Sequence, residues 1–423
     1  MATTAADAKP QVMVTADGTP LKASLARALR RNKMRALLLV APLFIFILFT
    51  FFIPIGDMLT RSAENSIVAE ILPRTVKALQ GWDESSDSLP DEAVYAALVE
   101  DIREGQKSRT INKVGLRLNY EKSGMSSMFR STARKAKRME PPYKEALIKA
   151  NKRWGDIANW RVIKRESAKF TPSYYLAALD LTYNDADDII SKPREESIYL
   201  RLLWRTIWVS ALITVLCLLL AYPVSYLLSV LPAKSSNLLI ILVLLPFWTS
   251  LLVRTTSWIA LLQQEGVIND LLVFVGLVAD DNRLAMIHNR TGTIIAMTHI
   301  LLPFMILPLY SVMKTISPVY MRAALSMGAN PLTAFVRVYM PQTVAGIGAG
   351  SILVFILAIG YYITPALVGG TSGTLISNEI ARHMSVSLNW GLAAALGAIL
   401  LAIVMALYFL YDKIVGIDNM KLG

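Results

Sequence analysis

The sequence predicts an all-α membrane protein with six transmembrane helices and a large, mostly helical insert between the first and the second of them. Hydrophobic residues make up 54% of the 423 residues and charged residues only 17%, well to the apolar side of ordinary globular domains. The apolar residues gather in stretches of about 20, the length that an α-helix needs to cross the hydrocarbon core of a bilayer. A long charged segment without any such stretch separates the first two of them.

Six apolar stretches are expected to form the transmembrane helices. They lie at 37–59, 204–231, 238–262, 291–314, 344–368 and 391–411. The first is too long for the apolar part of a signal peptide, and no small-residue cleavage site follows it closely, so we expect an uncleaved membrane anchor. The other five fall within 204–411. The segment 60–203 is rich in charge, Tyr and Trp, and we expect it to fold as a soluble, mostly helical domain.

The positions of Lys and Arg predict the orientation of the chain. Basic residues near the ends of spans stay on the cytoplasmic side, and residues 1–36 carry seven of them. The loop 315–343 and the tail 412–423 also contain Lys or Arg, whereas the short loops on the other side hold few. We therefore expect these three segments in the cytoplasm and 60–203 outside, because a long domain is translocated largely regardless of charge. The net charge of +12 then reflects topology, and no nucleic-acid partner is expected.

No catalytic or metal site is predicted. The phosphate-binding motif G-x-x-x-x-G-K-[ST] is absent, so this chain is not expected to bind ATP in that way. His288, His299 and His383 lack the spacing of metal ligands, and His299 is expected to be a hydrogen-bonded core residue of the fourth span. Cys217, the single cysteine, cannot form an internal disulfide and is expected to pack inside the second span. We expect a protein without enzymatic activity of its own.

Residues 322–347 lie between two spans and are too mixed in polarity to cross a membrane. Gly328 permits a backbone turn that other residues resist, and Pro331 is suited to the first turn of a following helix. An apolar stripe at helical spacing follows, formed by Leu332, Phe335, Val336 and Tyr339. Such a helix suits a groove on a partner protein. The alternatives are a helix that lies on lipid headgroups or packs on its own chain.

This segment resembles the cytoplasmic EAA loop of ABC importer permeases. The matching residues are Ala323, Ala324, Gly328, Ala329, Phe335, Val338, Pro341, Gly346 and Ile347. In that family the loop forms two short helices that dock into a groove on an ATPase subunit. The resemblance implies that a partner ATPase dimer binds ATP and Mg²⁺ and that this chain holds no cofactor. Arg322 stands where the family usually has Glu, so we expect the partner surface to differ at that point.

The third span carries the most polar residues. Arg254 is expected near the middle of the membrane, where a charge is expensive and marks a functional site by default. The alternative is that Arg254 ties helices together through carbonyl or carboxylate groups. The hydroxyl residues around it either line a wet path or bond to their own helix; they are Thr249, Ser250, Thr255, Thr256 and Ser257.

Two motifs are similar to the permeases of spermidine/putrescine-type importers. They are FWTSLLVRT at 247–255, followed by EGVIN at 265–269, and GYYITPALVGG at 360–370. The resemblance covers about 30–59 and 200–423. It implies the type I ABC importer permease architecture, a bacterial inner membrane, a sister permease and a periplasmic binding protein that delivers the substrate. It also places the insert 60–203 in the periplasm, although the family usually has a short loop there.

The residues expected to line a substrate path share polarity or an aromatic ring within the spans. They are Trp248, Thr249, Arg254, Trp258, Tyr361, Tyr362 and Thr364. Aromatic faces attract ammonium groups, which suits a polyamine. The nearest carboxylates lie at the outer ends of spans, and Arg254 would repel a polycation. Either the sister permease supplies carboxylates, or the substrate carries an anionic group, as an amino-acid conjugate or an opine does.

Two further alternatives concern the whole chain and the insert. A membrane-anchored receptor would need only one span, which makes six spans and the 322–347 segment unexpected for it. A secondary transporter would show matching halves with broken helices, and no such repeat is seen. The basic cluster of the insert is either a solvated face or a contact surface for an acidic partner; it contains Arg134, Lys135, Lys137 and Arg138.

Overall fold

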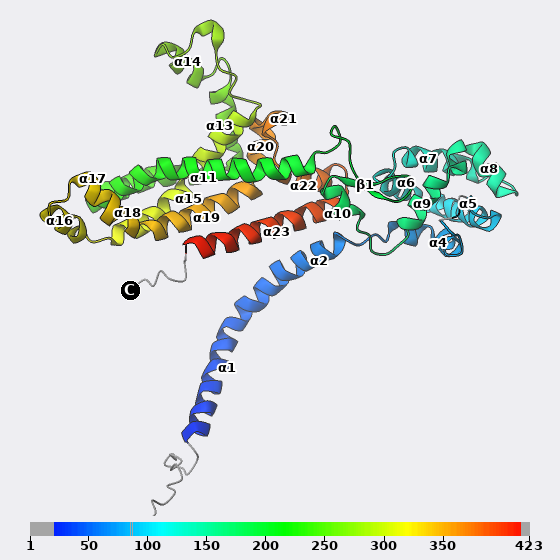
Figure 1. Cartoon of the computed structure of the whole chain (residues 1–423), viewed down its shortest axis with the longest axis horizontal. Coiled ribbons are helices and arrows are strands. Elements are labelled where there is room, and N and C mark those ends of the chain that lie inside the picture. The colour runs from blue at the N-terminus through cyan, green and yellow to red at the C-terminus, as the bar shows by residue number, and fades with distance from the viewer. Residues whose placement is uncertain (1–20, 85, 87, 416–423) are drawn as a thin grey trace, which may run out of the picture. The chain divides into compact units, whose positions relative to one another are not determined.

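The computed structural model describes residues 21–84, 86 and 88–415, and Figure 1 shows that this part of the chain is built almost entirely of helices. The expected N-terminal segment therefore lies outside the described residues for its first 20 positions, and the expected tail for its last eight. The chain divides into two compact units, Met1–Thr60 and Arg61–Gly423, which are described separately.

The first unit contains one long apolar helix. Its elements are α1 (Leu21–Ile47), the π-helical turn η1 (Leu48–Phe52) and α2 (Ile53–Arg61). Within its most apolar 18-residue window no residue is buried. A helix that is apolar on every side needs hydrocarbon or another helix around it, as expected of a transmembrane segment.

The second unit begins with a helical insert that has a core of its own. Its elements are α3 (Ile67–Ile71), α4 (Pro73–Leu79), α5 (Glu92–Lys107), α6 (Ile111–Asn119), α7 (Met125–Ala136), α8 (Tyr143–Ala150), η2 (Lys152–Gly155), α9 (Ile157–Arg165), α10 (Ser173–Ala178), β1 (Leu181–Tyr183) and β2 (Ile189–Ser191). The two strands pair antiparallel, with Thr182 opposite Ile190. The ring of Trp160 lies edge-on to Tyr95 at 4.8 Å, and its Nε1 donates to the Trp154 carbonyl at 3.0 Å. These rings bury large apolar areas with their polar atoms paired, which fixes the centre of the domain.

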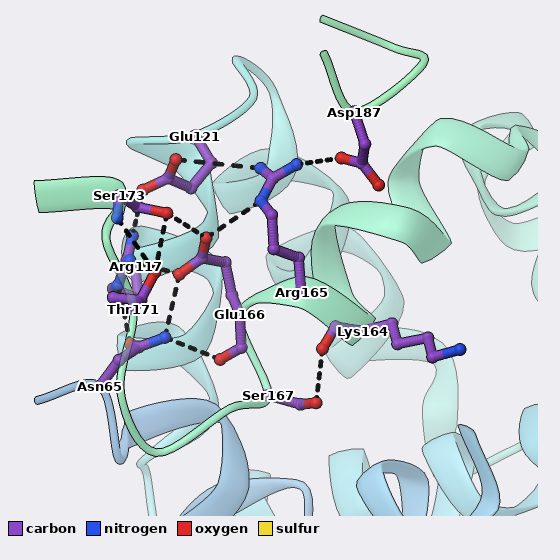
Figure 2. Close-up of polar contacts among 10 residues, drawn as sticks. All are labelled: Asn65, Arg117, Glu121, Lys164, Arg165, Glu166, Ser167, Thr171, Ser173 and Asp187. Atoms are coloured by element: carbon purple, nitrogen blue, oxygen red, sulfur yellow. Dashed lines mark hydrogen bonds and ion pairs between the residues drawn. The ribbon is translucent and has the colours of Figure 1, made fainter. Parts of the chain in front are cut away.

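A buried network of charged and polar side chains joins distant segments of the insert (Figure 2). Arg117 of α6 donates from Nη2 to Glu166 Oε2 at 2.5 Å and from Nε to Asn65 Oδ1 at 2.9 Å. Its Nη1 donates to Glu121 Oε1 at 2.7 Å. Glu166 also accepts from the Asn65 amide at 2.9 Å and from Ser173 Oγ at 2.7 Å. Arg117 and Glu166 are almost completely buried, so each charge depends on this pairing to be tolerated in the core.

The remainder of the second unit consists of apolar helices and their connections. They are α11 (Tyr199–Val230), α12 (Ala233–Leu244), η3 (Leu245–Trp248), α13 (Leu251–Leu262), α14 (Val267–Phe274), η4 (Asp280–Asn282), α15 (Arg290–Thr315), α16 (Pro318–Ser326), α17 (Pro331–Ala334), η5 (Phe335–Tyr339), α18 (Met340–Gln342), α19 (Val344–Gly360), α20 (Ile363–Val368), α21 (Gly370–Gly373), α22 (Ile376–Ser385) and α23 (Trp390–Val415). In the described chain, four helices are long and apolar enough to cross a membrane, and two bent pairs raise this number to six if each pair forms one span. The four are Leu29–Arg61, Tyr199–Val230, Arg290–Thr315 and Trp390–Lys413.

The third and fifth expected spans are not continuous helices. In the stretch 238–262 the chain breaks after Trp248 and bends by 95° into the next helix, because Pro246 lies in the short turn η3 and Ser250 Oγ caps α13 by accepting from the Val253 amide at 3.2 Å. In the stretch 344–368, α19 ends at Gly360, and α20 starts a new helix at Ile363. Continuous apolar composition predicted the membrane location of these stretches but not their internal breaks.

Helices α11, α15 and α19 pack together, as Figure 1 shows. Small residues allow the close approach: a Cβ at Gly350 of α19 would lie 2.7 Å from Met305 Sδ of α15, and one at Gly346 would lie 3.1 Å from the Leu309 Cα. Cys217 of α11 is buried in the same core, as expected, with its Sγ 3.5 Å from the Thr298 carbonyl. This three-helix packing supports the loops that carry the candidate site.

Candidate functional site

The break between η3 and α13 exposes an indole ring. Trp248, the last residue of η3, is 75% exposed. Thr249 follows it in extended conformation, and its hydroxyl donates to the Pro246 carbonyl at 2.8 Å. The Thr249 hydroxyl thus closes the turn, while the Trp248 ring is available for contact. Within the described residues, no side-chain hydrogen bond or ring contact joins Trp248 to the other expected path residues.

Arg254 lies one turn into α13 and has no ion-pair partner among the described residues. Its Nε is buried without a hydrogen-bond partner, and its guanidinium carbon lies 5.9 Å from the centroid of the Phe247 ring. Arg254 is close enough to His299 and Tyr361 to act on both electrostatically. One expected structural role for Arg254 was to tie helices together through a carboxylate. Among the described residues, no carboxylate pairs with Arg254.

Trp258, one turn further along α13, contacts His299 of α15. Its indole Nε1 donates to His299 Nδ1 at 3.1 Å, and the two rings meet edge-on at 5.2 Å. His299 was expected to be a hydrogen-bonded core residue; the hydrogen bond is present, but the side chain is exposed. The expectation of a core position was wrong because α15 packs on α11 and α19 through its other faces. The sequence feature that could have indicated His299 as a residue of this site is a single histidine in an otherwise apolar stretch.

Thr364 of α20 joins two helices. Its hydroxyl lies 3.2 Å from the Thr255 hydroxyl of α13, and both residues are fully buried. Thr255 Oγ1 also donates to the Leu251 carbonyl at 2.9 Å, so this hydroxyl supports its own helix and the partner helix at once. In the described conformation Thr364 holds α20 against α13 and lines no open space.

Tyr361 and Tyr362 connect α19 to α20. Tyr361 is half-buried against the α11–α15–α19 core, whereas the ring of Tyr362 is exposed. Their carbonyl groups accept hydrogen bonds from α22: Ser377 Oγ donates to the Tyr361 carbonyl at 2.6 Å, and Asn378 Nδ2 donates to the Tyr362 carbonyl at 2.7 Å. These two α22 residues were missed by the sequence analysis, since no pattern links positions 16 residues apart. The structure thus gathers Arg254, the Tyr pair and the Thr364 helix around α13, α15 and α20.

The segment 315–343 forms two short helical parts joined by a left-handed turn. Gly328 has φ +90°, and a Cβ there would meet no atom within 4 Å, so it is the backbone conformation that requires glycine. Ala329 donates its amide to the Ala324 carbonyl at 3.1 Å across this turn. Asn330 Oδ1 caps α17 by accepting from the Thr333 amide at 2.7 Å, and Pro331 is its first residue, as predicted.

The apolar stripe of this segment is divided between two faces. Leu332 is 72% exposed, and Met327 beside the Gly328 turn is 82% exposed. Further residues of this segment are exposed: Val319, Tyr320, Arg322, Ala323, Leu325, Val336 and Pro341. Phe335 and Tyr339 turn inward and stack on one another at 5.4 Å, with Tyr226 of α11 edge-on to both at 5.3 Å. One half of the stripe therefore packs on its own chain, which was one of the two alternatives to a partner groove, and the other half remains exposed.

The comparisons with known proteins identify a family. Residues 218–415 match the family described as "Binding-protein-dependent transport system inner membrane component". The spermidine/putrescine transport system permease protein PotB of Haemophilus influenzae is 34% identical over 222 residues, which are 52% of this chain and 77% of the relative. The chain belongs to the ABC importer permeases. The resemblance to the spermidine/putrescine type is confirmed, as is a multi-pass permease of the inner membrane.

Other relatives agree with this assignment. PotB of Escherichia coli is 34% identical over 215 residues, 51% of this chain and 77% of the relative. The inner membrane ABC transporter permease protein YdcU of Escherichia coli is 30% identical over 259 residues, 58% of this chain and 77% of the relative. The crystal structure of a bacterial ABC transporter involved in the import of the acidic polysaccharide alginate is 16% identical, covers 53% of this chain and 80% of that chain, and has a TM-score of 0.44. The assignment to the permease family rests on the sequence relatives.

Proposed function

We propose that this permease is the transmembrane subunit of an ATP-driven importer that takes up polyamines of the spermidine/putrescine class. The observation that carries the proposal is the 34% identity to a spermidine/putrescine permease over three quarters of that relative's length. The chain works with a sister permease, an ATPase dimer that binds ATP and Mg²⁺, and a periplasmic binding protein that delivers the substrate. Its own role is to form half of the pathway through the lipid bilayer.

The proposed topology has six spans. The bent stretch 238–262 counts as one span and the stretch 344–368 as another, the N-terminal segment 1–36 and the tail 412–423 lie in the cytoplasm, and 37–59 forms the first span. The insert 60–203 is periplasmic, and 204–411 holds spans two to six with the coupling loop 315–343 on the cytoplasmic side. The concentration of Lys and Arg before the first span supports this orientation.

Coupling to ATP hydrolysis is proposed to pass through the loop 315–343. Its open face, with Met327 and Leu332 most exposed, is the surface that a groove of the ATPase would cover. Its inner face contacts α11 through Phe335 and Tyr339, so a displacement of the loop is transmitted to that helix. This is an alternating-access mechanism in which closure of the ATPase dimer shifts the balance between two states of the spans.

The path residues offer aromatic faces to an amine. The exposed rings of Trp248 and Tyr362 suit ammonium groups through cation–π attraction. Arg254 opposes a polycation, and in the polyamine proposal carboxylates of the sister permease offset it. One observation favours a second candidate, an amino-acid conjugate or opine-like solute: the buried Nε of Arg254 has no hydrogen-bond partner in the described chain, so a carboxylate of the substrate would satisfy it.

The test is ATPase stimulation of the whole complex in nanodiscs with its binding protein. The solutes are putrescine, spermidine, basic amino acids, opines and sugars, and each is also tested on an Arg254→Met complex. Stimulation by polyamines that survives Arg254→Met supports the first candidate. Stimulation only by carboxylate-bearing solutes, lost in Arg254→Met, supports the second. A complex that isolates without any ATPase would refute both and favour a membrane-anchored receptor.

A further inference from the structure

Helix α22 is bonded to the backbone of the candidate path. Ser377 and Asn378 donate to the carbonyl groups of Tyr361 and Tyr362 at 2.6 and 2.7 Å. The Tyr362 carbonyl also accepts from the Ala366 amide at 3.0 Å, so one oxygen is shared by α20 and α22. A shift of α22 along its axis would break or strain these bonds, because hydrogen bonds weaken within a few tenths of an ångström and with misalignment.

The opposite end of α22 is bonded to the insert. His383 is buried, its Nε2 lies 2.9 Å from the Tyr199 hydroxyl, and its Nδ1 lies 2.8 Å from Ser387 Oγ. The Ser387 carbonyl accepts from the hydroxyl of Tyr120, which stands at the end of helix α6 of the insert, at 2.8 Å. The insert therefore reaches the chain two residues beyond α22 through a direct bond.

A close packing contact reinforces this junction. Tyr174 of α10 lies against Gly391 near the start of α23, where a Cβ would be only 2.4 Å from the tyrosine ring. Tyr174 also belongs to a core shared by α10, α11, α22 and α23. The ring is held from the insert side as well, since the Arg117 guanidinium lies over it at 4.5 Å. The insert thus ends in an interface that has little freedom to move independently of α22.

We propose that α22 is a strut that sets the position of Tyr361 and Tyr362 according to the position of the insert, with Ser377 and Asn378 as positioning residues. The role of the Tyr pair in transport rests on the proposed function. The mechanical connection between the insert and the Tyr pair does not. It gives the insert a part in transport: an event on the insert alters the path through Tyr120, α22 and the two carbonyl bonds. Coupling of this kind needs contiguous bonded elements between the two sites, and each link is present here.

The experiment is a double-mutant cycle in the assembled importer. Tyr120→Phe removes only the hydroxyl on the insert side, and Ser377→Ala removes only the hydroxyl that donates to the Tyr361 carbonyl on the path side. Each single variant is expected to lower substrate-stimulated ATPase activity by about fivefold, the scale of one lost hydrogen bond. Because both act through one strut, the double variant should lose little more than the more severe single variant. If the fold losses of ATPase activity in the two single variants multiply in the double variant, the two sites are independent, because independent effects add in free energy. That result would overturn the proposal.

Matched controls and a second readout separate this inference from the proposed function. Tyr143→Phe removes another tyrosine hydroxyl of the insert, and Ser385→Ala removes an exposed hydroxyl of α22 that bonds only within its helix at 2.7 Å. Neither control should change stimulation or the cycle. Hydrogen exchange of the peptide containing the Ala366 amide should accelerate in Tyr120→Phe. If exchange accelerates but transport is unaffected, the mechanical connection through α22 holds and the Tyr pair is not part of the substrate path. No acceleration, together with intact transport, overturns the strut itself.

Discussion

Arg117→Met is expected to lower the free energy of unfolding of the insert more than any substitution at its surface. The change keeps an apolar stem but removes the charge that is paired with the fully buried Glu166 at 2.5 Å and with Glu121 at 2.7 Å. Removing one partner of a buried pair leaves an uncompensated charge and typically costs about 3–5 kcal/mol. That is a large fraction of the about 5–15 kcal/mol that stabilises an ordinary domain.

The assay is hydrogen exchange of peptides from α6 and α9 in the full-length protein in nanodiscs, at fixed pH and temperature. Sub-global opening of the insert should become more frequent by about two orders of magnitude or more, as that free energy implies. Arg153→Met is the matched control, because Arg153 is exposed and donates only to two uncharged groups, the Gly124 carbonyl at 2.9 Å and Ser127 Oγ at 3.4 Å. Equal effects of the two substitutions would refute the argument that burial makes the Arg117 pair critical.

Three further predictions concern the pH dependence and the coupling loop. Burial is the main cause that raises the pKa of Glu121, and the charge of Glu166 is the next. The stability that this raised pKa contributes is present below the unfolded pKa of Glu121 and is lost as pH rises through the folded pKa. Glu121→Gln should therefore flatten the dependence of the free energy of insert unfolding on pH, and an unchanged slope would contradict this. Gly328→Asp should abolish transport without preventing membrane insertion, since a Cβ at φ +90° costs about 1–2 kcal/mol and redirects the turn; normal uptake would count against the coupling loop. Phe335→Ala should uncouple ATP hydrolysis from uptake while ATPase binding is retained, because the Phe335 ring packs on α11. Val336→Ala, at an exposed position, should instead weaken ATPase binding, as measured by co-purification. The reverse pattern would contradict the assignment of the two faces.

Features that depend on neighbours in the sequence were predicted well. Apolar length predicted the long helices, and the Gly328 and Pro331 pair predicted the turn and the start of α17, because these depend on the conformational preference of single residues. Pro246 is a residue at which a helix can kink or end, but the sequence did not decide that the chain breaks after Trp248. Apolar composition continues across this break, and whether a proline bends a membrane helix or ends it depends on which neighbouring groups satisfy the freed backbone.

Features that join distant positions could not be read from the sequence. Arg117 and Glu166 are 49 residues apart, and the cluster they form in the insert has no periodic signature. The same holds for the exposed face of His299, which depends on how α15 packs on α11 and α19. Among the expected path residues, the structure places Thr364 in a buried contact between helices and leaves Tyr362 open, a distinction that residue type alone does not make.

Helix α11 receives contacts at both of its ends from the two segments that matter for the proposals. Near its C-terminal end, Tyr226 packs against the inner face of the loop 315–343; at its N-terminal end, Tyr199 bonds to His383 of α22. Helix α11 is assigned as one helix from Tyr199 to Val230, although it contains Pro223. Movement imposed on the loop by an ATPase and movement imposed on α22 by the insert would therefore meet in the same helix. In the proposed topology, this arrangement would let a chain without the G-x-x-x-x-G-K-[ST] motif respond to events on both sides of the membrane.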